Sequence, residues 1–86
     1  MPDPVTIYRG AQGENEDDAY LGALYRPSWT LSRERAEWFA NRWDHWDTGV
    51  VACATVPRSS IMFYSNAREE QEVIPDTLPP PSFKIL

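Results

Sequence analysis

The sequence predicts a small α+β domain in which a mixed or antiparallel sheet of short strands packs against one main helix. Three observations lead to this fold class. The 86 residues are 42% hydrophobic and 13% aromatic, which suits one modest core and excludes a disordered chain. Apolar and polar residues alternate in several short runs, as strands require. One segment carries the apolar period of a helix.

The composition also excludes several kinds of protein. One cysteine, Cys53, and one histidine, His45, leave no disulfide framework and no set of zinc ligands, so we expect no metal. No apolar run approaches the roughly 18 residues of a membrane span, and the first residues lack a signal-peptide pattern. We therefore expect a cytoplasmic protein without a membrane partner. The net charge of −5 argues against direct binding of nucleic acid but suits a target protein that is basic or binds nucleic acid.

The first half of the chain predicts two extended segments and the helix. The run from Val5 to Arg9 alternates as a strand and stops at Gly10. Residues 11–18 are polar and acidic, which is typical of a solvated loop or of the charged first turn of a short helix. Residues 27–31 read as extended again, and Ser32 is a good N-cap for a helix that ends near Trp43. That helix would bury Ala36, Phe39, Ala40 and Trp43.

The second half predicts strands separated by turn residues. Residues 50–56 are rich in β-branched side chains and end at Pro57, and residues 61–64 form a short apolar run. Residues 68–74 pass from a charged loop into a strand. We expect one domain over residues 1–76, followed by a proline-rich tail or edge strand over residues 77–86. Beyond the helix, the expected core comprises Val5, Ile7, Trp29, Leu31, Val51, Cys53, Thr55, Ile61, Phe63 and Val73.

Three polar motifs stand on the predicted strands. The first strand ends in Tyr8, Arg9 and Gly10, and the segment before the helix reads Ser28-Trp29-Thr30. The late strand begins with Glu70-Gln71-Glu72-Val73-Ile74. Each motif also has an ordinary structural explanation when it is taken alone. The arginine would be an exposed cation, the Ser/Thr pair would reflect β-propensity, and the Glu-x-Glu pair would be a solvated acidic face. In this order and spacing they resemble the Arg, Ser-x-Ser/Thr, Glu-x-Glu signature of mono-ADP-ribosyltransferases of the arginine–serine–glutamate type. The resemblance covers about residues 5–75 and includes the helix with its Phe39-Ala40 pair.

The resemblance implies a minimal or truncated family member with an ADP-ribosyltransferase-like fold. It would transfer ADP-ribose from NAD, its substrate, to a protein side chain, with arginine as the expected acceptor. Nicotinamide release passes through an oxocarbenium-like ribosyl cation, so a carboxylate must stabilise that charge, as in glycosidases. The resemblance gives this part to Glu72. Glu70, two residues earlier on the same strand face, would orient or deprotonate the acceptor.

The cofactor-binding residues that the resemblance implies are Tyr8, Arg9, Gly10, Ser28 and Thr30. Arg9 would hold a phosphate or the nicotinamide-side ribose through its forked donors. Ser28 would donate a hydrogen bond to Glu72 and fix its rotamer, and Thr30 would line the same wall. Tyr8 or Tyr64 would stack on nicotinamide.

A function of a different class stays open. Residues 11–27 form a short connection where larger family members place helices that help to enclose NAD. The alternative is a small acidic inhibitor, of the kind that phages encode against host machinery such as a CRISPR complex, which binds and occludes a host protein without catalysis. The acidic cluster from Glu14 to Asp18 and the side chains of Trp38 and Trp46 are its candidate contacts. A piece of a larger toxin domain or an accessory subunit is a third reading.

Overall fold

The computed structural model describes residues 3–13, 15–25, 28–41, 48–66, 71–80 and 82–86. Within these ranges the strands form one six-stranded antiparallel sheet in the order β4-β5-β2-β1-β3-β6, accompanied by short helices. The α+β class predicted from the sequence is confirmed. The elements are β1 (Val5–Gly13), α1 (Glu16–Tyr25), β2 (Trp29–Thr30), α2 (Arg33–Ala40), β3 (Thr48–Val56), the 3-10 turn η1 (Arg58–Ser60), β4 (Ile61–Ser65), β5 (Glu72–Pro75) and β6 (Phe83–Ile85).

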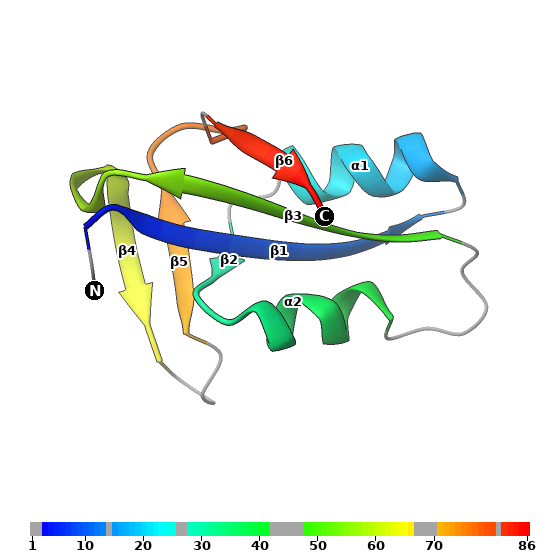
Figure 1. The fold of residues 1–86 in the computed structure, drawn as a ribbon, viewed down its shortest axis with the longest axis horizontal. Coiled ribbons are helices and arrows are strands. Elements are labelled where there is room, and N and C mark those ends of the chain that lie inside the picture. The colour runs from blue at the N-terminus through cyan, green and yellow to red at the C-terminus, as the bar shows by residue number, and fades with distance from the viewer. Residues whose placement is uncertain (1–2, 14, 26–27, 42–47, 67–70, 81) are drawn as a thin grey trace.

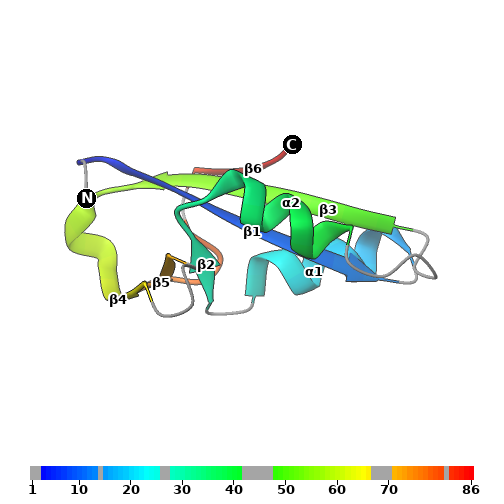
Figure 2. The ribbon, with the colours of Figure 1, turned by 90° about the horizontal axis from the view of Figure 1, so that it is seen from below.

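The sheet consists of a long pair of strands and a crosswise pair. β1 and β3 pair along their whole length, from Val5↔Val56 to Gly13↔Thr48. β4 and β5 run crosswise to them, as Figures 1 and 2 show. The two-residue strand β2 joins both pairs, since it pairs with β1 at Tyr8↔Thr30 and with β5 at Thr30↔Glu72.

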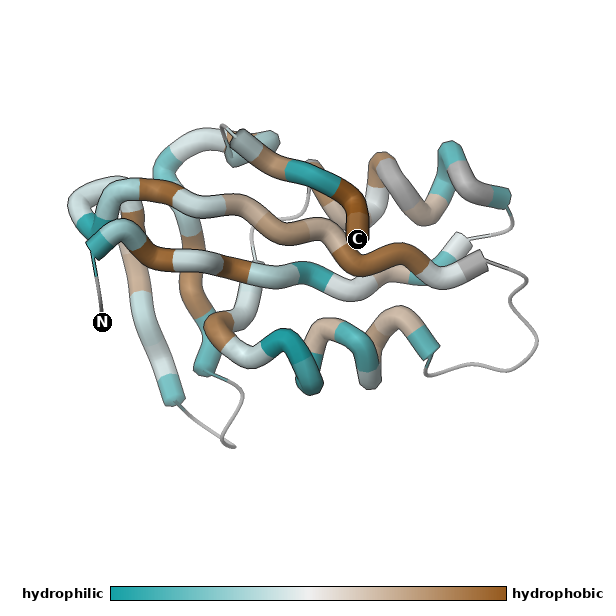
Figure 3. The backbone as a smooth tube through the Cα atoms, in the orientation of Figure 1, coloured by the Kyte–Doolittle hydropathy of each residue, from teal (hydrophilic) through white to brown (hydrophobic). Residues whose placement is uncertain are grey.

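The two α-helices cover opposite faces of the β1–β3 pair (Figure 1). A Cβ atom added to Gly13 would lie 2.5 Å from the backbone N of Ala19 in α1. One added to Gly10 would lie 1.7 Å from the backbone O of Ala36 in α2. Because residues at odd and even positions of a strand point to opposite faces, the helices lie on different sides. Much of α2 is teal in Figure 3, as expected for a helix whose outer face meets solvent.

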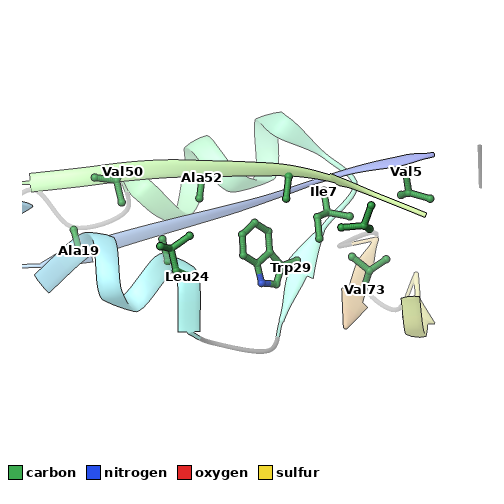
Figure 4. Packing of buried hydrophobic residues seen from close by; sticks show 11 residues of the cluster. Val5, Ile7, Ala19, Leu24, Trp29, Val50, Ala52 and Val73 are labelled. Carbon is green, nitrogen blue, oxygen red and sulfur yellow. The ribbon is translucent and has the colours of Figure 1, made fainter. Parts of the chain in front are cut away.

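The main core lies on the α1 side of the sheet. In Figure 4 the Trp29 ring lies between Leu24 of α1 and Ile7 of β1. Trp29, Leu24 and Ile7 are each at most 1% exposed. Burying side chains of this size contributes about 1.5–3 kcal/mol each, so this cluster is a principal source of stability. Its members are Val5, Ile7, Ala19, Ala23, Leu24, Trp29, Val50, Ala52, Ala54, Val56 and Val73.

Two local predictions at the N-terminal end were incomplete. β1 does not stop at Gly10 but continues to Gly13, because its second half completes the ladder with β3. Of the two alternatives predicted for residues 11–18, a loop or the charged first turn of a short helix, the structure has the helix, which begins at Glu16 and continues to Tyr25. Asn15 helps to begin this helix, since its Oδ1 accepts a hydrogen bond of 2.9 Å from the backbone N–H of Asp18.

The predicted core face of β3 was wrong. The core takes Val50, Ala52, Ala54 and Val56, while Val51 is half-buried and Thr55 is exposed. A shift of one residue exchanges the two faces of a strand, and a continuous apolar run gives no alternation to choose between them. Cys53 is buried as predicted, on the α2 side.

Phe63 was expected in the core but is 48% exposed, because β4 is one of the two edge strands of the described sheet. Leu31 and Ile61 are partly buried against the core. Residues 83–85 form an edge strand, β6, which pairs with β3. α2 ends at Ala40 with Asn41 as C-cap, and the predicted position of Trp43 lies outside the described residues. No helix within the described ranges is long and apolar enough to span a membrane.

Candidate functional site

A cavity of about 240 Å³ brings together most of the residues that the motifs single out. It is bounded by β1, β2 and β5 and by one side of α2. The lining residues are Tyr8, Arg9, Gly10, Ser28, Trp29, Thr30, Arg35, Phe39 and Glu72.

The register of the sheet explains why residues from three distant segments meet. Tyr8, Thr30 and Glu72 are paired across β1, β2 and β5, so their side chains leave the same face of the sheet. The next pair along β2 and β5, Trp29↔Val73, is buried in the core on the opposite face. The fold therefore turns Thr30 and Glu72 away from the core and toward α2.

Glu72 is held by its neighbours on both sides. The Ser28 hydroxyl donates a hydrogen bond to Oε2 of Glu72, which is the contact predicted from the sequence. The preceding residue, Gln71, has a φ of 50°, a left-handed conformation that a residue with a side chain rarely adopts. Its carbonyl accepts a hydrogen bond of 3.1 Å from the backbone N–H of Leu31. This turn begins β5 at Glu72 and fixes where the carboxylate enters the cavity.

Arg9 connects β1 to the segment that carries Ser28. Its Nε donates a hydrogen bond of 3.1 Å to the carbonyl of Gly22 in α1, and its Nη1 donates to the carbonyl of Ser28. The side chain of Ser28 in turn binds Glu72. Arg9, Ser28 and Glu72, one residue from each motif, are thus linked in a continuous chain of hydrogen bonds.

The remaining predicted residues have structural contacts as well. The hydroxyl of Thr30, a buried residue, accepts a hydrogen bond of 3.1 Å from the backbone N–H of Ser32, next to the start of α2. Gly10 lets the backbone of α2 approach β1. Tyr8 lines the cavity, whereas Tyr64 lies on β4 and is not among its lining residues. Glu70, the second predicted catalytic carboxylate, lies outside the described residues, as do His45 and Trp46.

Two cavity residues from α2, Arg35 and Phe39, were not predicted as site residues, and Phe39 was expected in the core. The Arg35 guanidinium lies 4.9 Å from the ring centroid of Trp38 and 5.7 Å from that of Phe39. Their spacing in the sequence places them on one side of α2, but it does not show that this side lines a cavity. They lie four residues apart, each just before one of the buried alanines, Ala36 and Ala40, that face β1.

The cavity thus offers a carboxylate, two guanidinium groups and aromatic rings, which suits an organic ligand carrying both positive and negative charge. No three His, Cys, Asp or Glu side chains in the described part of the chain gather as metal ligands would. Comparison of the chain with protein-family models, with curated proteins and with solved structures finds no match.

Proposed function

We propose that the protein is a minimal mono-ADP-ribosyltransferase of the arginine–serine–glutamate type. It would use NAD⁺ as a substrate and modify a protein side chain, with arginine as the expected acceptor. The observation that carries this proposal is the hydrogen-bonded chain from Arg9 through Ser28 to Glu72 at the wall of a cavity. Three motifs chosen for their order in the sequence are joined in space.

The residues suit the chemistry of ribosyl transfer. The bond between the nicotinamide nitrogen and ribose C1′ breaks, and its electron pair leaves with nicotinamide. The acceptor nitrogen then forms a bond to C1′ and gives up a proton. The family resemblance assigns the acceptance of this proton to Glu70. A carboxylate fixed in place by Ser28 stabilises the developing cation at C1′ without having to reorganise. Tyr8 and Phe39 supply aromatic surfaces at which nicotinamide can stack.

The size of the cavity indicates which part of NAD⁺ it takes. Its volume of about 240 Å³ is below the roughly 300–1,000 Å³ of ordinary small-molecule sites. We expect the nicotinamide and its ribose to enter, with the adenosine half beyond the mouth.

Replacement of the carboxylate by its neutral amide tests the proposal. We expect Glu72→Gln to lower the rate of NAD⁺ consumption by about 100-fold or more, because the amide no longer carries the charge that stabilises the cation. The measurement is nicotinamide release by the purified protein, with a candidate arginine-containing acceptor present. Glu34→Gln, the same chemical change at an exposed position on α2, is the control and should retain full activity. Equal rates for the two variants would refute the catalytic assignment of Glu72.

One observation favours a second candidate, a binding module that occludes a target protein without catalysis. The edge strand β4 exposes three consecutive large apolar side chains, with Met62 71%, Phe63 48% and Tyr64 44% exposed. Edge strands are commonly protected by charged residues or proline, and β4 contains neither. Such a surface suits contact with another protein, and a function based on it would require neither NAD⁺ nor Glu72.

A further inference from the structure

We propose that Arg35, which belongs to none of the three motifs, binds the diphosphate group of the substrate and so orients it in the cavity. This inference rests on the proposed function and adds a substrate-binding residue to it.

The start of α2 and its close approach to β1 place Arg35 at the cavity. Ser32 caps the helix, since its hydroxyl accepts a hydrogen bond of 3.2 Å from the backbone N–H of Arg35. Gly10 and Gly49 allow the helix backbone to approach closely, because a Cβ on either would lie within about 2 Å of a carbonyl oxygen of Ala36 or Ala40. With α2 held in this position, the side chain of Arg35 lines the cavity.

Two aromatic rings of α2 lie beside the guanidinium group of Arg35. The guanidinium lies over Trp38 and Phe39 at 4.9 and 5.7 Å from their centroids, and those two rings meet edge to face at 5.0 Å. In general, a guanidinium that contacts a ring through its face keeps its N–H groups in its own plane, at right angles to that contact. A planar fork of this kind matches the oxygens of a phosphate.

The charges around the cavity then favour one orientation of the ligand. Arg9 directs two of its N–H groups to the backbone carbonyls of Gly22 and Ser28, which makes it a positioning residue for the Ser28 segment. The carboxylate of Glu72 repels an anion and attracts the cationic nicotinamide ribose. The diphosphate is therefore expected beside α2, at Arg35, with the reacting ribose beside β5.

The test compares ligands that differ in phosphate. Wild-type, Arg35→Gln and Arg33→Gln proteins are titrated with NAD⁺ and with nicotinamide riboside, which has no phosphate group. Arg33 is the matched control, because it lies on the same helix, is 60% exposed and pairs with Glu37 at 2.9 Å. We expect Arg35→Gln to weaken NAD⁺ binding roughly tenfold or more and to leave nicotinamide riboside binding unchanged. Arg33→Gln should change neither.

Two results would overturn the assignment of Arg35. One is an NAD⁺ affinity of Arg35→Gln equal to that of Arg33→Gln. The other is an equal loss of affinity for both ligands, which would report a damaged cavity rather than a lost phosphate contact.

ADP-ribose separates this inference from the proposed function, because it carries the diphosphate but no nicotinamide to release. If the wild type binds ADP-ribose through Arg35 but does not consume NAD⁺, the Arg35 assignment stands and the transferase proposal fails. If NAD⁺ consumption depends on Glu72 while Arg35→Gln binds both nucleotides like the wild type, the Arg35 assignment fails alone. A wild type that binds neither ligand overturns both.

Discussion

Ser28 shows how a small polar residue at the end of a connection controls a carboxylate. Its carbonyl accepts from Arg9 and its hydroxyl donates to Glu72, so both ends of the residue are held. A hydrogen bond to a charged carboxylate is stronger than one between neutral groups. The Ser28 hydroxyl therefore favours the rotamer of Glu72 that keeps this bond.

We therefore expect Ser28→Ala to lower the rate of NAD⁺ consumption by about tenfold, since Glu72 loses its donor but keeps its charge. Ser28→Thr keeps a hydroxyl at the same position and should retain most of the activity. The two rates, measured beside the unfolding free energies of both variants, separate an effect on the carboxylate from an effect on folding. Full activity in Ser28→Ala would show that the hydrogen bond does not support turnover.

The contact between α2 and β1 shapes the cavity. Ala36 and Ala40 are buried, and the strand residues opposite them, Gly10 and Gly49, have no side chain. With a larger residue at Gly10 the helix would move outward and carry Arg35 and Phe39 away from β1.

Two glycine substitutions are expected to change the free energy of unfolding in opposite directions, and the one at Gly10 tests the contact between α2 and β1. Gly10→Ala should reduce the free energy of unfolding by about 2 kcal/mol or more, because the new methyl group would lie 1.7 Å from the carbonyl oxygen of Ala36. Gly22→Ala, in the helix α1, should increase it by about 0.5–1 kcal/mol, because its methyl group would meet only the Cβ of Ala11, at an ordinary 3.8 Å. Denaturant unfolding measures both. A Gly10→Ala protein as stable as the wild type would contradict the described position of α2.

The helices also show which elements could be predicted from sequence. α2 was predicted because Ser32 caps it and Ala36 and Ala40 repeat at the helical period. For α1 the sequence left a loop and a short helix open, because the buried side of this helix is mostly alanine while Leu21 is 55% exposed, so its apolar pattern is weak. The formation and position of α1 depend on its packing against the strands, which the local sequence does not reveal.

The order of the strands in the sheet brings the residues of the candidate site together. The motifs of Arg9, Ser28 and Glu72 are far apart in sequence, and the order β5-β2-β1 makes their strands neighbours. The sequence suggested these residues through their type and spacing, but the wall formed by Arg35 could not be predicted, because it depends on how closely α2 approaches β1. The wrong core face predicted for β3 also reflects tertiary packing. Because helices cover both faces of β3, its apolar and polar residues do not alternate in a way that identifies the core face.

The most direct test of the central claim is a titration of the isotope-labelled wild-type protein with NAD⁺, followed by NMR. We expect saturable shifts in the backbone amides of the cavity residues Arg9, Ser28, Thr30, Glu72 and Arg35. Little change is expected at the distant edge strand β6. The absence of saturable shifts, or shifts confined to Met62, Phe63 and Tyr64 of β4, would contradict the claim that this cavity binds NAD⁺.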